Sequence, residues 1–143
     1  MIDVTLEVLI HRPRPTVAAF MFEPRNDQRW TSGVVACRPL TDGPLRAGSR
    51  VERTAKFLGR RFAYEYLVTD ADPERFVEMR VTQPFPMQIR YTLDDAPDGT
   101  VTRIRAQGEP SGFFRLASAL VAPMVRRNIG KDLQNLKALL EAA

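Results

Sequence analysis

The clearest hydrophobic pattern in the chain lies in its last stretch, from Ser111 to Glu141. In the second half, apolar residues recur at spacings of three and four, which predicts a helix that buries one face; they are Val125, Ile129, Leu133, Leu136 and Leu140. The first half carries a second apolar stripe, roughly 160° away at about 100° per residue, formed by Phe113, Leu116, Leu120 and Met124. Pro123 lies near the change of phase, where a proline ends or kinks a helix.

The start of the chain alternates between apolar and polar residues, which is typical of a half-buried strand. This strand runs from Ile2 to His11, and Pro13 and Pro15 end it. Proline fits the first turn of a helix. We therefore expect a short helix from Thr16 to Phe22 and one further helical turn from Arg25 to Trp30.

Between Gly33 and Gly108, short apolar runs are separated by turn residues, which predicts a series of antiparallel strands. The expected strands are Val34 to Leu40, Arg50 to Leu58, Arg60 to Thr69, Phe76 to Val81, Met87 to Leu93 and Thr100 to Ala106. Strands followed by one long helix indicate an α+β fold, a curved sheet of about seven strands on the terminal helix. The chain has no repeats or linkers, so residues 1–143 are expected to form a single domain.

Composition narrows the possible functions without selecting one. The net charge of +4 comes mainly from scattered arginines, so we expect no nucleic-acid partner. Cys37 is the only cysteine and His11 the only histidine, which excludes an internal disulfide and any multi-cysteine metal site. No paired carboxylates, phosphate-binding loop or metal cluster is recognisable. We therefore expect no metal and no cofactor, and whether the protein is an enzyme stays open.

The start of the chain and its apolar runs bear on location. The chain begins Met-Ile-Asp, without the basic and apolar regions of a secretory signal. No apolar run reaches the length that a bilayer requires. A cytoplasmic protein without an integral membrane segment is expected.

The order of elements resembles a known superfamily. The two-helix insert ends in Asp27-Gln28-Arg29-Trp30, and the chain closes with Leu133-x-x-Leu136-Lys137-x-x-Leu140-Glu141. Together with the element order, these stretches are similar to the START-like, or SRPBCC, superfamily, and most similar to its polyketide cyclase/dehydrase-type members. The resemblance implies a helix-grip fold around a hydrophobic cavity. It also implies a lipid, a polyketide or an aromatic molecule as ligand, although members of one fold differ in function.

Alternation predicts which side chains face this cavity. Tyr64 and Tyr66 share the apolar face of one strand, and Tyr91 lies on the apolar face of another. Buried tyrosine hydroxyls seek hydrogen-bond partners, so they are candidates to orient a ligand. The alternative is that all three are ordinary core aromatics.

Arg53 is the most specific single candidate for a contact with a ligand. It lies between Val51 and Ala55 on a strand face that is otherwise apolar. A buried guanidinium requires a carboxylate or an anionic ligand. A one-residue bulge would instead turn Arg53 to solvent.

Several other positions have a functional and a structural interpretation. The resemblance places Trp30 at the cavity entrance, where it would cover a bound ring, whereas core packing is the alternative. Asp27 and Glu65 are candidate acids or bases, or else solvated or helix-end residues. The second apolar stripe, formed by Phe113, Leu116, Leu120 and Met124, either lines the cavity, forms a homodimer surface or contacts a membrane surface.

Three functional hypotheses follow. The first is a binding protein for a small hydrophobic molecule, with Trp30, Arg53, the three tyrosines, Phe113, Leu116 and Leu120 as contacts. The second is a cyclase or dehydratase of a polyketide-like substrate in the same cavity. The third is an interaction module that uses the apolar start of the terminal helix.

Overall fold

The computed structural model describes the chain apart from residues 58, 84, 113–114 and 116–117. The first strand and the short helices are β1 (Ile2–Ile10), α1 (Arg14–Met21), η1 (Pro24–Asn26) and α2 (Asp27–Trp30). The other strands are β2 (Val34–Pro39), β3 (Arg50–Phe57), β4 (Arg60–Asp72), β5 (Phe76–Val81), β6 (Met87–Ala96) and β7 (Gly99–Gly108). The long helix α4 spans Ser118–Ala142.

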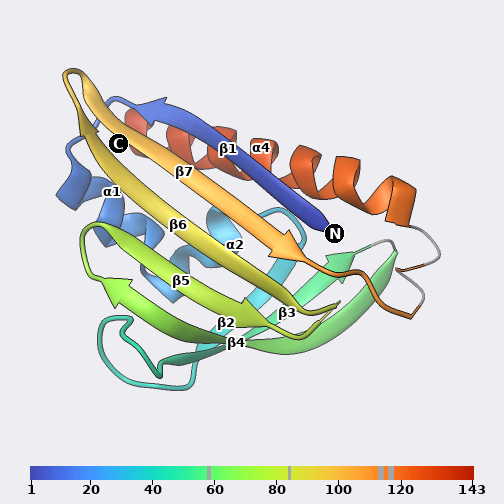
Figure 1. The fold of residues 1–143 in the computed structure, drawn as a ribbon. Helices are drawn as coiled ribbons and strands as arrows, with labels where there is room; N and C mark the ends of the chain where they lie inside the picture. Colours follow the sequence, from blue (N-terminus) through green and yellow to red (C-terminus); the bar gives the residue numbers. More distant parts are fainter. Residues whose placement is uncertain (58, 84, 113–114, 116–117) are drawn as a thin grey trace.

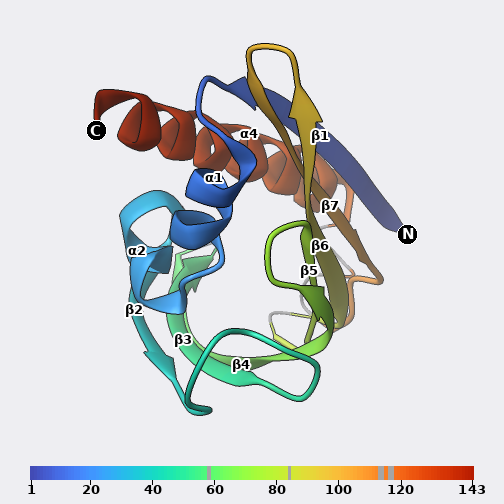
Figure 2. The same ribbon diagram turned by 90° about the vertical axis from the view of Figure 1, so that its left-hand side faces the viewer.

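The strands form one antiparallel sheet of seven strands in the order β1-β7-β6-β5-β4-β3-β2. β1 is the first strand in the chain but pairs with the last strand, β7. Helix α4 follows β7 in the chain. The sheet curls around one side of the molecule, and α1, α2 and α4 close the open side (Figures 1 and 2). This is the helix-grip fold that the element order predicts.

The structure differs from the expectation at several element boundaries and at Pro123. β4, β6 and β7 extend beyond their predicted ends, because the ladder pairs their polar terminal residues as well as their apolar ones. Helix α4 also continues through Pro123. The proline is exposed, so the backbone carbonyl that loses its partner lies on the solvent side of the helix, where water can satisfy it.

Helix α4 packs into the concave face of the sheet through one continuous stripe. Val125, Ile129, Leu133, Leu136 and Leu140 are all buried in the core, together with Val121. The strands contribute the side chains that point to the concave face, such as Val4, Val68 and Leu93. The hydrophobic core therefore lies between the helix and the sheet.

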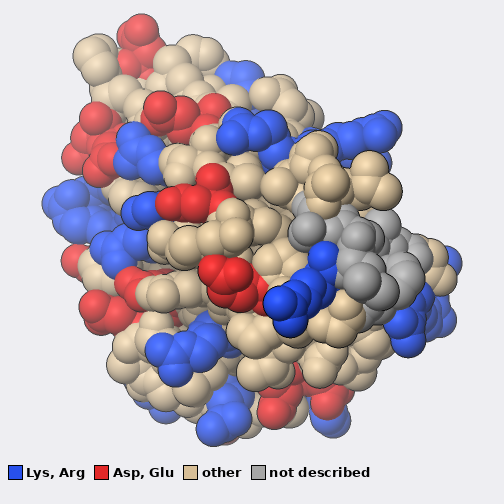
Figure 3. Space-filling view, turned by 45° about the vertical axis from the view of Figure 1, so that its right-hand side comes forward, with Lys and Arg blue, Asp and Glu red and all other residues tan. Residues whose placement is uncertain are grey.

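The convex face of the sheet is polar. Ion pairs join neighbouring strands there: Asp3–Arg105, Glu7–Arg103, Glu78–Arg90 and Arg38–Glu52. On the face shown in Figure 3, basic and acidic side chains lie side by side, as expected where opposite charges pair across strands. Among the described residues, no helix is long and apolar enough to cross a membrane.

The hairpin between β6 and β7 depends on Gly99. Its φ is 155°, and a Cβ atom at this position would overlap the carbonyl oxygen of Ile10. No side chain fits so close to the backbone. The glycine therefore lets the hairpin pass directly against the end of β1.

Two leucines on α4 test the packing of the helix. Leu136 is fully buried, whereas Leu120 is 68% exposed. We expect Leu136→Ala to lower the free energy of unfolding by about 2–5 kcal/mol and Leu120→Ala to change it by less than about 0.5 kcal/mol, both measured by urea unfolding. A large effect at Leu120 would contradict this and would indicate that a second copy covers it.

Candidate functional site

A row of side chains crosses the inner face of the sheet at its β2–β4 end. Cys37 of β2 and Tyr64 of β4 are the two cross-strand neighbours of Arg53 on β3. Arg53 is only 4% exposed, so the strand keeps the regular alternation and turns the guanidinium inward. Sequence reasoning left this orientation open, because a bulge would have reversed it.

The partner of Arg53 is Asp27, the first residue of α2, which is 2% exposed. Both Nε and Nη2 of Arg53 donate hydrogen bonds to Oδ2 of Asp27, at 3.1 and 2.7 Å. The guanidinium also lies over the ring of Tyr66, 4.6 Å from its centroid, in a cation–π arrangement. One ion pair therefore joins the short helix to the sheet.

The electrostatics of the pair follow from its burial. Burial raises the pKa of the Asp27 carboxyl, against the opposing effect of Arg53. Burial works to lower the pKa of Arg53, but the charge of Asp27 raises it above the ordinary value. A guanidinium stays protonated in proteins, so Arg53 remains a cation beside Asp27.

Cys37 belongs to the same cluster. Its Sγ lies 3.5 Å from Oδ2 of Asp27 and donates a weak hydrogen bond to it. Burial, and then the charge of Asp27, raise the pKa of this thiol to about 12. Since thiolates rather than thiols are nucleophiles, Cys37 is a structural residue here.

A cavity of about 160 Å³ opens beside Arg53, between the sheet and α4. We call it the Arg53 cavity. Its apolar wall consists of Val34, Ala55, Phe62, Met87, Ile89, Ile104, Ala106, Val125 and Ile129. Its polar side chains are Thr31, Ser32, Arg53, Lys56, Tyr64, Tyr91, Asn128 and Asp132. The cavity thus combines a hydrophobic wall with a few convergent polar groups, as small-molecule sites do.

Asp132 of α4 is the second buried carboxylate at this site. Its Oδ1 accepts a hydrogen bond of 2.6 Å from the backbone N–H of Ser32 and a second from the Ser32 hydroxyl. Burial raises its pKa to about 6, although Ser32 and Arg53 oppose the shift. Sequence reasoning missed this residue among the polar side chains of the helix. The available signal was its spacing, because Asp132 follows Val125 by seven residues and falls on the buried stripe.

The structure separates the expected tyrosines. Tyr64 and Tyr91 line the Arg53 cavity, and the hydroxyl of Tyr64 lies 3.5 Å from Nη1 of Arg53. Tyr66 is not among the described lining residues, because its ring lies beneath the guanidinium. Burial raises the pKa of Tyr91 to about 12, so its hydroxyl remains neutral.

Trp30 does not cover the cavity as the resemblance suggested. It is buried in the core and meets the ring of Tyr91 edge-on, with centroids 5.7 Å apart. Trp30 therefore packs against Tyr91, which lines the cavity. Asp27, in contrast, is neither solvated nor a free acid, because it holds Arg53.

The apolar stripe at the start of the terminal helix needs a similar correction. Leu120 faces solvent and does not line the cavity, because its neighbour Val121 takes the inward position on α4. Phe113 and Leu116 lie outside the described residues. Met124 is half-buried.

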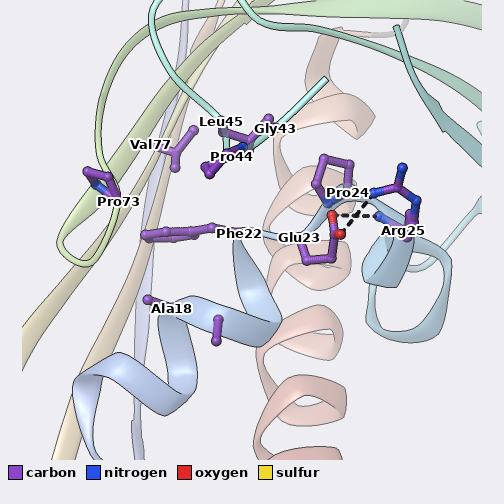
Figure 4. A pocket seen from close by; sticks show the side chains of 11 residues that line it. Ala18, Phe22, Glu23, Pro24, Arg25, Gly43, Pro44, Leu45, Pro73 and Val77 are labelled. Atoms are coloured by element: carbon purple, nitrogen blue, oxygen red, sulfur yellow. Dashed lines mark hydrogen bonds and ion pairs between the residues drawn. The ribbon is translucent and has the colours of Figure 1, made fainter. Parts of the chain in front are cut away.

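A larger pocket of about 340 Å³ lies at the C-terminal end of α1 (Figure 4). Its walls come from α1, η1, the β2–β3 loop and β5, and the residues are mostly small or apolar, including Ala18, Phe22 and Pro44. Among its described lining residues, the two charged side chains, Glu23 and Arg25, pair with each other at 3.0 Å. This pair is exposed to solvent, whereas the Arg53–Asp27 pair is buried. The pocket is therefore a weaker candidate for a ligand site than the Arg53 cavity despite its size.

Metal binding finds no support in the described part of the chain. No group of three or more His, Cys, Asp or Glu side chains there is placed to hold an ion. His11 is exposed at the end of β1, where its ring lies 3.3 Å from the carbonyl oxygen of Asp98.

The sequence matches one family model along nearly its whole length. The family is described as polyketide cyclase / dehydrase and lipid transport, and the match covers residues 1–141. No curated protein matches the chain in sequence.

Solved structures share the fold at low sequence identity. TTHA0849 from Thermus thermophilus is 17% identical with a TM-score of 0.79, over 98% of this chain and 97% of that one. NE0264 from Nitrosomonas europaea is 19% identical with a TM-score of 0.76, over 99% and 95%. The di-domain ARO/CYC BexL from the BE-7585A biosynthetic pathway is 18% identical with a TM-score of 0.77, over 99% of this chain and 47% of BexL. These similarities establish the fold alone.

The buried ion pair has a measurable effect on stability. We expect Asp27→Asn to lower the free energy of unfolding by about 3–5 kcal/mol, because it leaves the Arg53 cation buried without a counter-charge. Glu52→Gln is the control, since Glu52 precedes Arg53 on the same strand and pairs with Arg38 on the exposed face. It should cost at most about 1 kcal/mol. Equal effects in urea unfolding would show that the buried pair is not special.

Asp132 gives a pH-dependent prediction. A pKa raised from 3.8 to about 6 means that the folded protein disfavours the ionised carboxylate. Its stabilising contribution is therefore complete below about pH 4 and is lost as the pH rises through about 6. Asp132→Asn should be more stable than the wild type by about 1–3 kcal/mol at pH 7.5, with the difference vanishing near pH 4. A constant difference between the two pH values would contradict the raised pKa.

Proposed function

The chain belongs to the polyketide cyclase/dehydrase and lipid transport family, and we propose that it binds a small, mainly aromatic molecule in the Arg53 cavity. The observation that carries the proposal is the buried arginine beside the apolar wall of this cavity. Apolar surface supplies affinity without orientation. A fixed cation beside it supplies the orientation.

The volume of the cavity limits the ligand. At about 160 Å³ it is close to a protein cavity of roughly 150 Å³ that accommodates benzene. This favours one ring with small substituents over a long-chain lipid. Burial of the ring against residues such as Phe62 and Ile89 would contribute about 25 cal/mol per Å² before association costs.

The geometry of Arg53 indicates which group of the ligand it would hold. Nε and Nη2 are used by Asp27, while Nη1 points toward Tyr64 at 3.5 Å. The pair with Asp27 already balances the charge of the guanidinium, so a neutral carbonyl oxygen suits this site better than a full anion. The hydroxyl of Tyr64 can donate to the same oxygen.

The proposal is tested with acetophenone, which has one ring and one carbonyl group, by calorimetric titration. We expect Ala55→Phe to abolish binding because it fills the cavity, and Tyr64→Phe to weaken binding about 3- to 10-fold by removing one hydrogen bond. Ala63→Phe is the matched control, since Ala63 is exposed on the neighbouring strand. Binding that survives Ala55→Phe unchanged would show that the probe does not occupy this cavity.

A cyclase or dehydratase is the second candidate. The observation that favours it is the same immobilised N–H of Arg53, because a fixed donor at a carbonyl oxygen stabilises the charge that develops in enolate chemistry. The fold neighbour BexL, named as an ARO/CYC, makes this chemistry worth testing. It requires turnover of a poly-β-keto thioester analogue, and binding without turnover would leave the first candidate.

A further inference from the structure

The carboxylate of Asp132 lies at a buried position, where its ionised form does not stabilise the fold. It lies on the buried stripe of α4 and lines the Arg53 cavity. An aspartate at such a position disfavours folding near neutral pH unless its charge is fully compensated. Its compensation here is incomplete.

The two oxygens of Asp132 have different surroundings. Oδ1 receives both hydrogen bonds, from the backbone N–H and the hydroxyl of Ser32. No described side chain or backbone group donates to Oδ2. Asp132 lines the cavity, and Ser32 fixes its carboxylate through Oδ1. Oδ2 is therefore the oxygen left to accept a hydrogen bond from a ligand.

The charged and titratable groups around Asp132 come from several elements. Arg53 on β3 and Lys131 on α4 favour its ionised form. In addition to burial, the charge of Asp132 contributes to the raised pKa of Tyr91 on β6. Lys56 of β3 lines the same cavity. None of these described groups is hydrogen-bonded to the carboxylate.

We propose that Oδ2 of Asp132 accepts a hydrogen bond from a hydroxyl or N–H group of the ligand and is the specificity-determining contact of the Arg53 cavity. The inference rests on the proposed binding function and deepens it. Arg53 and Tyr64 offer donors on the sheet side, and Asp132 offers an acceptor on the helix side. The ligand class is therefore a single ring that carries both a carbonyl acceptor and a hydroxyl or N–H donor.

The experiment compares acetophenone with 3- and 4-hydroxyacetophenone, which add one donor at different positions. At pH 7.5 the wild type should bind the better hydroxylated probe about tenfold more tightly than acetophenone, because the acceptor is charged. Asp132→Asn keeps the shape and the acceptor for Ser32 but replaces Oδ2 by a donor. The preference should then disappear or reverse.

The matched control is Asp94→Asn, which removes an exposed carboxylate that pairs with Arg103 on the convex face. It should keep the full preference for the hydroxylated probe. Circular dichroism verifies that each variant is folded. Asp132→Asn is expected to be at least as stable as the wild type at this pH.

A pH series separates a direct contact from a structural role. The preference of the wild type should fall as the pH drops from 7.5 to 5, because protonation of Asp132 removes the charged acceptor. In Ser32→Ala the midpoint should move to higher pH, since the Ser32 hydroxyl lowers the pKa of Asp132. In Asp132→Asn the preference should not vary with pH.

Two results would overturn the inference in distinguishable ways. If all probes bind but Asp132→Asn keeps the wild-type preference at every pH, Asp132 does not contact the ligand, and the proposed binding function stands. If no probe binds the wild type, or if Ala55→Phe leaves binding intact, the binding function in this cavity fails together with the inference.

Discussion

A buried arginine requires neighbouring groups that stabilise its positive charge, because the guanidinium cannot lose this charge by deprotonation. In this protein the constraint is met by Asp27, which is the first residue of a helix of four residues, and by the ring of Tyr66 beneath the guanidinium. The pair fixes α2 against β3. The position of α2 in turn places Trp30 behind Tyr91 and brings Ser32 to Asp132.

The cavity is a consequence of this arrangement. α4 fills the concave side of the sheet with an apolar stripe, and the carboxylate of Asp132 lies on the same buried face and lines the Arg53 cavity. Two polar groups of opposite charge thus face one small apolar space from the helix and from the sheet. A fully apolar core at this level would favour folding, and the retained polar groups are what would make the space selective for a ligand.

The alternation of apolar residues predicts the inner face of the strands, including Tyr64 and Tyr91. It left the orientation of Arg53 open, because a one-residue bulge would have turned the side chain outward. It cannot distinguish a residue that touches the cavity from one a layer behind it, which is why it groups Tyr66 with the cavity residues. The same limit applies to Leu120, which is apolar but faces solvent.

The sequence by itself determined the element order, the curved sheet on a terminal helix and the resemblance to the family, since these follow from local periodicity, turn residues and chain order. Only the tertiary structure decided which polar residues meet. Asp27 and Arg53 are 26 residues apart, and Ser32 and Asp132 are 100 apart. Sequence reasoning therefore left the role of Asp27 open and overlooked Asp132. No local pattern encodes such a pairing, because it arises when sheet curvature and helix packing bring separate segments to one point.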